Sequence, residues 1–128
     1  MPYGKLHVIV FEAKGLPAVE LISKNDPFCK VTLMGSNQVV TTPSVSNAGA
    51  SVRWEHAESL NVIEGQDELV CEVWDYNSFS RNELISAGRH SIIPACQKPG
   101  PYDAWCTLKD AKGRPGGELR LILHFQSS

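Results

Sequence analysis

Hydrophobic and polar residues alternate along much of this chain with a period of two. The clearest example runs from Glu68 to Asp75, where Leu69, Cys71 and Val73 fall on one face. Alternation of this kind is typical of a β-strand with one buried face. It recurs in eight segments separated by turns rich in glycine, proline, asparagine and serine. The predicted strands cover residues 6–13, 28–33, 38–42, 52–62, 68–75, 84–93, 104–108 and 118–125.

No segment carries the longer hydrophobic repeat of a sustained helix. Residues 94–101 contain three prolines and a glycine, so we expect an irregular connection there. Eight short strands joined by turn signals predict an all-β fold, an eight-stranded antiparallel β-sandwich. The length of 128 residues fits a single domain spanning 1–128, and we expect a monomer.

Composition and charge exclude several classes of function. A net charge of −2 lacks the basic surplus of a nucleic-acid-binding domain. The longest apolar runs are far shorter than a bilayer span, so no transmembrane segment is predicted. The N-terminus leads directly into a strand pattern, so we expect no signal peptide and a cytoplasmic location.

The cysteines and histidines show no arrangement that predicts catalysis or a zinc site. The spacing of the four cysteines matches no zinc motif, and we expect reduced thiols, with Cys29 and Cys71 as small buried hydrophobic side chains. The four histidines are scattered through strand patterns, and no nucleophile motif or phosphate-binding loop is present. We therefore expect no enzymatic activity.

Two loops between predicted strands gather carboxylate and amide groups. The first, residues 13–28, contains Glu20 and Asp26; the second, residues 74–85, contains Asp75, Asn77 and Glu83. Two loops at one end of a rigid sandwich can bring such groups together. Ca²⁺ takes roughly six to eight oxygen ligands, so these loops can form a Ca²⁺ site. By composition alone, the same residues are also typical of solvated loop charges.

Four motifs in order along the chain resemble those of C2 domains. They are Ala-x-x-Leu-Pro followed by Asp-Pro-Phe, Asp-x-Asn followed by Glu-Leu-Ile, Trp-Cys-Thr-Leu, and Gly-Gly-Glu-Leu entering the last strand. The resemblance covers nearly the whole chain and implies a C2-type β-sandwich. The chain opens on the Ala-x-x-Leu-Pro strand and ends on a Gly-x-Leu strand, which is similar to the permutation called type II topology.

The resemblance also implies a partly substituted Ca²⁺ site. The five aspartates of C2 domains that bind Ca²⁺ well fall here on Glu20, Asp26, Asp75, Asn77 and Glu83. Two of these are aspartate, two are longer by a methylene, and Asn77 lacks the charge. Losing one negative charge weakens the attraction for a cation. We therefore expect weak binding of one Ca²⁺, with a dissociation constant on the order of tens of micromolar or higher.

The loop tips carry residues that can contact a membrane. In C2 domains, apolar side chains at these tips often enter the bilayer, and the resemblance places Leu21, Ile22 and Phe79 there. Lys24 and Arg81 flank them and can meet anionic headgroups. The alternative is that these are exposed or folded-back loop side chains. Residues 38–58 contain Arg53 as their one basic residue besides histidine, so no lysine-rich phosphoinositide site is expected there.

Two functions remain open at this point. The first is reversible, peripheral docking to an anionic phospholipid membrane through the end loops, with weak Ca²⁺ binding. The second is a Ca²⁺-independent module for binding another protein.

Overall fold

The computed structural model describes residues 3–19, 24–77 and 81–127. Within these residues the chain forms eight strands and one short helix, and every predicted strand is present. The elements are β1 (Gly4–Lys14), β2 (Pro27–Leu33), β3 (Val39–Thr41), β4 (Val52–Val62), β5 (Glu68–Asp75), β6 (Glu83–Ser91), α1 (Ile93–Gln97), β7 (Tyr102–Lys109) and β8 (Pro115–Ser127).

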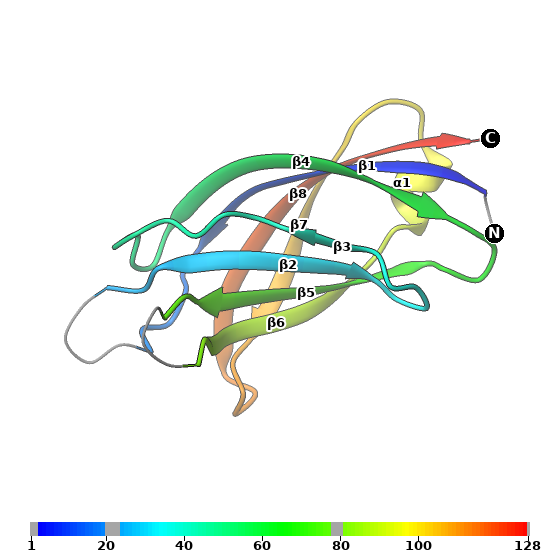
Figure 1. Ribbon diagram of the computed structural model, residues 1–128. Helices are drawn as coiled ribbons and strands as arrows, with labels where there is room; N and C mark the ends of the chain where they lie inside the picture. Colours follow the sequence, from blue (N-terminus) through cyan, green and yellow to red (C-terminus); the bar gives the residue numbers. More distant parts are fainter. Residues whose placement is uncertain (1–2, 20–23, 78–80, 128) are drawn as a thin grey trace.

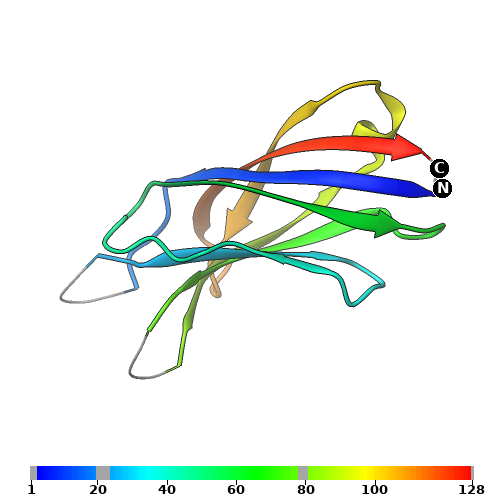
Figure 2. The ribbon, with the colours of Figure 1, turned by 45° about the horizontal axis from the view of Figure 1, so that its top comes forward.

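The strands form an antiparallel sheet that folds over into two layers (Figures 1 and 2). The order of the strands is β3-β2-β5-β6-β7-β8-β1-β4. The fold-over lies between β6 and β7, which pair only at Ala87 and Lys109. The two outermost strands in this order, β3 and β4, are linked by the side chain of Gln38, which lies next to β3. Its amide donates to the Asn61 carbonyl of β4 at 2.6 Å and accepts from the Asn61 N–H at 2.7 Å. The result confirms the predicted eight-stranded antiparallel sandwich, and the type II assignment stays a prediction from chain order.

The core lies between the layers and follows the predicted alternation. Leu69, Cys71 and Val73 are all fully buried, as are Leu6 and Val8 on β1. Cys29 is also buried, so both predicted core cysteines are confirmed, and all four cysteines are free thiols. Burial of such side chains is the main favourable contribution to folding.

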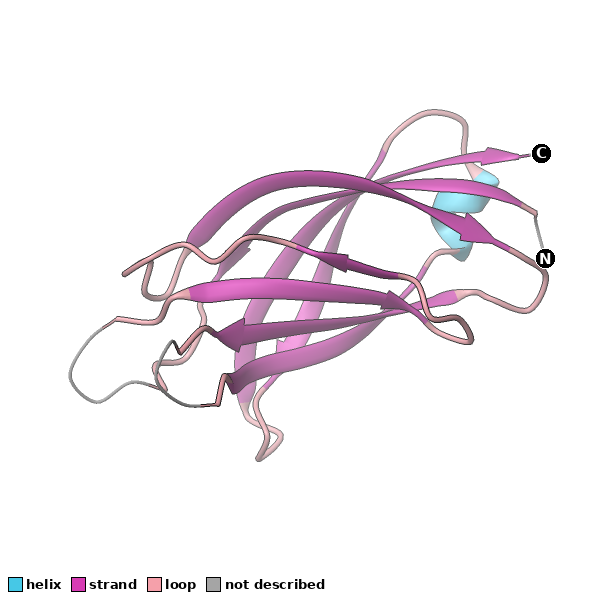
Figure 3. Ribbon diagram, in the orientation of Figure 1, coloured by secondary structure: helices cyan, strands magenta, loops and turns pink. Residues whose placement is uncertain are grey.

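The prediction for residues 84–101 is wrong in one respect. Strand β6 ends at Ser91, and a short helix, α1, follows over Ile93–Gln97 (Figure 3). Pro94 fits because proline is tolerated in the first turn of a helix, where its missing N–H has no intrahelical partner. Ile92 and Ala95 anchor this segment in the core with no exposed surface. Five helical residues are too few to produce a visible periodicity.

Candidate functional site

The first predicted loop ends on β2 and the second begins on β5, and these two strands are neighbours in the sheet. Pro27, the first residue of β2, pairs with Asp75, the last residue of β5. Asp26 precedes Pro27 directly, so the pairing brings the two aspartates side by side. The start of β2 and the end of β5 lie at the end of the sandwich opposite the chain termini (Figure 1).

Asp75 is the most deeply buried acid among the described residues, with 1% of its surface exposed. Its Oδ1 accepts a hydrogen bond from the backbone N–H of Asp26 at 2.7 Å. Its Oδ2 is buried and has no hydrogen-bond partner among the described residues. A buried carboxylate oxygen without a donor is unfavourable unless a cation approaches it. This oxygen is therefore suited to a hard cation such as Ca²⁺.

Asp26 connects three loops. Its Oδ1 accepts from the backbone N–H of Asn47 at 2.7 Å, and its carbonyl accepts from the N–H of Tyr76 at 3.0 Å. Asn47 belongs to the loop between β3 and β4 and has a φ of 55°, a left-handed conformation that asparagine tolerates. Sequence reasoning did not predict that this third loop joins the site. The stretch Ser46–Gly49 carries a turn signal, but nothing in it predicts contact with Asp26.

Asn25 holds the described parts of the first loop in place. It is 2% exposed, and its Oδ1 accepts from the N–H of Val19 while its Nδ2 donates to the carbonyl of Pro17 at 2.9 Å. Its own carbonyl accepts from the N–H of Gly49, in the β3–β4 loop. Asn25 is thus a positioning residue, and sequence reasoning missed it because an asparagine in a loop is usually solvated.

The remaining predicted ligands are less closely associated. The backbone N–H of Asn77 donates to the Oδ1 of Asn82 at 2.8 Å, within the second loop. Glu83 pairs with Asp75 in the β5–β6 register, but its side chain is exposed. Glu20 lies outside the described residues. Within ranges 3–19, 24–77 and 81–127, no group of three or more His, Cys, Asp or Glu is close enough to hold a metal.

Two of the predicted membrane-contacting residues, Lys24 and Arg81, are exposed at this end. The stem of Lys24 lies across Gly49, where a Cβ would be 3.5 Å from the lysine Cδ. Leu21, Ile22 and Phe79 lie outside the described residues. No helix among the described residues is long and apolar enough to cross a bilayer.

Comparison with known proteins agrees with this architecture. The family model for the C2 domain matches residues 4–108. The chain is 24% identical to 16 kDa phloem protein 2 of Arabidopsis thaliana, over 100% of this chain and 85% of that protein.

Two solved structures show the same fold. A single C2 domain of a plant Extended Synaptotagmin 1 superposes with a TM-score of 0.86 at 20% identity, covering 100% of this chain and 98% of that one. A calcium-bound structure of two C2 domains of Extended-Synaptotagmin 2 gives a TM-score of 0.81 at 22% identity, covering 99% and 47%. With the family model matched over most of its length, the chain belongs to the C2 domain family.

Proposed function

We propose that this chain is a non-catalytic C2 domain that docks reversibly on anionic membranes in the cytoplasm and binds one Ca²⁺ weakly at its loop end. The observation that supports this most strongly is the buried Oδ2 of Asp75, which has no hydrogen-bond partner among the described residues. Asp26 donates its backbone N–H to the other oxygen of Asp75, and its own carboxylate is the second proposed ligand. Ca²⁺ would neutralise this pair and link the loops around it.

Weak binding follows from how few strong ligands are close by. One oxygen of Asp26 and one of Asp75 already accept backbone N–H groups, which compete with an ion for the same lone pairs. Asn77 supplies an oxygen without a charge. Glu20 and Glu83 remain proposed ligands, and each carries a longer side chain than aspartate. Such a set favours one ion with modest affinity.

Membrane contact would combine apolar tips with basic flanks. Lys24 and Arg81 are exposed at the loop end, where each can contribute about 1 kcal/mol against an anionic surface. Leu21, Ile22 and Phe79 are the proposed inserting side chains, and each adds about 1.5–3 kcal/mol if fully sequestered. These sums support reversible docking.

The test is sedimentation with vesicles of phosphatidylserine and phosphatidylcholine, in millimolar Ca²⁺ and in chelator. We expect binding in Ca²⁺ and release by chelator. Asp75→Asn should abolish the Ca²⁺-dependent part, whereas Glu64→Gln, an exposed acid next to the turn after β4, should not. Calorimetric titration of chelator-treated protein provides the second readout. Absence of heat at millimolar Ca²⁺ would exclude the ion site.

A second candidate is a Ca²⁺-independent module for binding another protein. It is favoured by the hydrogen bonds of the protein itself that join the three loops through Asp26, Asn47 and Tyr76. In this case the chain would bind vesicles in neither condition. Equal binding in both conditions would instead indicate a constitutive contact through Lys24 and Arg81.

A further inference from the structure

Two cysteine thiols meet in the core where the sandwich folds over. Cys71 lies on β5 and Cys106 on β7, and neither is more than 1% exposed. Strand β6 runs between them, and its residue opposite Cys71 is Gly88. A Cβ on Gly88 would lie 3.3 Å from the Sγ of Cys106. Gly88 therefore lies between the two cysteines, and its missing side chain leaves room for their thiols to approach each other.

The backbone is weakly paired at this point. Strand β7 pairs with β8 from Tyr102 to Lys109, but with β6 only through Lys109 and Ala87. Elsewhere along this seam, the Cys106 thiol donates to the carbonyl of Arg89 at 3.6 Å. A thiol is a weak donor. Local opening of the β6–β7 seam therefore costs less than unfolding the sandwich, and it exposes Cys106.

We propose that Cys71 and Cys106 form an oxidation site that reacts with hydrogen peroxide and yields an intramolecular disulfide between β5 and β7. The Cys106 thiolate attacks one peroxide oxygen, the O–O bond breaks, and hydroxide leaves, so the sulfur becomes a sulfenic acid. The Cys71 thiol then loses its proton and attacks that sulfur, and the S–O bond breaks with release of water. Overall, two thiols lose two electrons and two protons, and one peroxide becomes two waters.

The two thiols are suited to unequal roles. The neighbouring Cys71 thiol, followed by the His90 ring, lowers the pKa of Cys106 to about 6, although burial opposes this. The neighbouring Cys106 thiol, together with burial, raises the pKa of Cys71 well above its usual value. Cys29, which lies near both on β2, has its pKa raised chiefly by burial. Cys106, which lies on the weakly paired strand β7, is the proposed nucleophile, and Cys71 is the proposed resolving thiol.

The disulfide would join the two layers on either side of the weak seam. Immunoglobulin domains place a disulfide similarly, between facing sheets in the core of a sandwich. Closing the chain between residues 71 and 106 restricts the unfolded state, so oxidation should raise Tm by roughly 5–15 °C.

The experiment treats the full chain with excess hydrogen peroxide without denaturant, blocks free thiols, and maps peptides by mass spectrometry without reduction. We expect peptides joined through Cys71 and Cys106, a raised Tm, and reversal of both by dithiothreitol. The linking rate should rise with pH, because the thiolate is the reactive form. Cys71→Ala should leave a sulfenic acid on Cys106 that dimedone labels.

Cys96→Ser is the matched control, since Cys96 is partly exposed on α1 and should not affect the link. Oxidation confined to Cys96 would overturn the proposal. So would a link through Cys29, or a link that forms only at denaturant concentrations that unfold the chain. The peptide map of the unsubstituted chain separates these outcomes even if Cys71→Ala folds poorly.

Discussion

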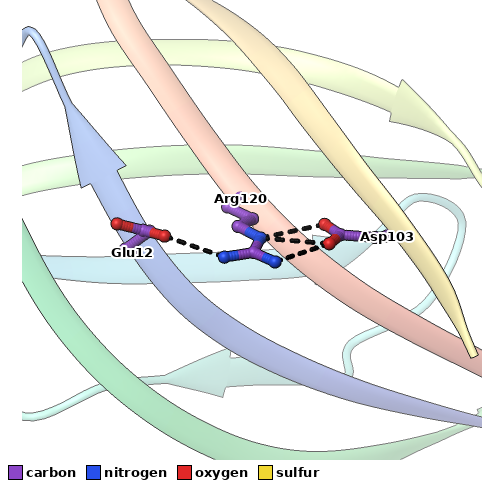
Figure 4. Close-up of polar contacts among 3 residues, drawn as sticks. All are labelled: Glu12, Asp103 and Arg120. Carbon is purple, nitrogen blue, oxygen red and sulfur yellow. Dashed lines mark hydrogen bonds and ion pairs between the residues drawn. The ribbon is translucent and has the colours of Figure 1, made fainter.

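Glu12 and Asp75 are both buried carboxylates, but of these two only Glu12 forms an ion pair among the described residues. Glu12 is 8% exposed, and its Oε2 accepts from the Nη1 of Arg120 at 3.0 Å. Arg120 also holds Asp103, at 2.6 Å from its Nη2, and so links β1, β8 and β7 (Figure 4). Asp75 is 1% exposed and has no cation beside it among the described residues.

This difference indicates how to interpret a buried acid in this fold. Glu12 has an internal counter-ion, so its charge is neutralised whether or not a ligand is present. Asp75 has only the N–H of Asp26 on one oxygen and, within the described ranges, no hydrogen-bond partner on the other. A buried charge without a partner is unfavourable, and it persists where a ligand supplies the partner. Glu12 therefore belongs to the framework, and Asp75 to the proposed ion site.

The largest expected effect comes from removing the internal cation. Arg120→Met removes the guanidinium, whose Cζ lies 4.7 Å from the centroid of the Phe11 ring, and leaves Glu12 buried without a counter-ion. Tm should therefore fall by roughly 5–10 °C in thermal unfolding followed by circular dichroism. Adding Glu12→Gln should restore part of the loss, because an amide carries no charge. If the double variant is no more stable than Arg120→Met, the buried charge of Glu12 is not the cause.

Neutralising each acid in turn should give opposite results. In chelator, Glu12→Gln should destabilise the chain, because Arg120 loses a charged partner. Asp75→Asn should leave Tm unchanged or higher, because it removes an unpaired charge. With Ca²⁺ at about a hundred times its dissociation constant, the unsubstituted chain should gain about 2.7 kcal/mol and Asp75→Asn nothing. A loss of stability from Asp75→Asn in chelator would show that its charge is already neutralised within the protein.

The same two acids show how far sequence reasoning reaches. The strands were predictable because alternation records burial directly, as in Leu69, Cys71 and Val73. That Asp26 and Asp75 share one end of the sandwich was predictable from the resemblance to C2 domains, whereas the pairing of β2 with β5, which brings them side by side, is seen only in the structure. The environment of Glu12 was not predictable. Strict alternation continues from Val8 and Val10 to Glu12, and it would place the Glu12 side chain in the core. The register shift between Val10 and Glu12 breaks this alternation, and the hydrophobic pattern of the sequence does not reveal such a shift.

The third loop was missed for a related reason. Asn47 reaches Asp26 only because it adopts a positive φ and because its loop folds back against β2. Both depend on contacts between segments 21 residues apart. A single sequence shows the turn chemistry of such a loop but not which carboxylate it meets.

The smallest effect concerns Asp103, the exposed partner of Arg120. The hydrogen bond from Arg120 lowers the pKa of Asp103 below its usual value of 3.8. A lowered pKa means that the folded chain binds fewer protons than the unfolded chain. The stabilisation is therefore complete above pH 3.8 and is lost as pH falls through the lowered pKa. Asp103 is 49% exposed in its side chain, so solvent screens the pair and the effect is modest.

Asp103→Asn measures this contribution by difference. Its Tm should lie roughly 1–3 °C below that of the unsubstituted chain at pH 6, and the gap should narrow towards pH 3. Asp110 also has a lowered pKa, caused first by the backbone N–H of Arg114. Its contribution is the same in both chains, so it cancels in the difference between their Tm values. A gap that stays constant with pH would mean that Asp103 acts by packing rather than by charge. The charge of Arg120 would then stabilise the fold only through Glu12, so the counter-ion of Glu12 would be the whole electrostatic difference between Glu12 and Asp75.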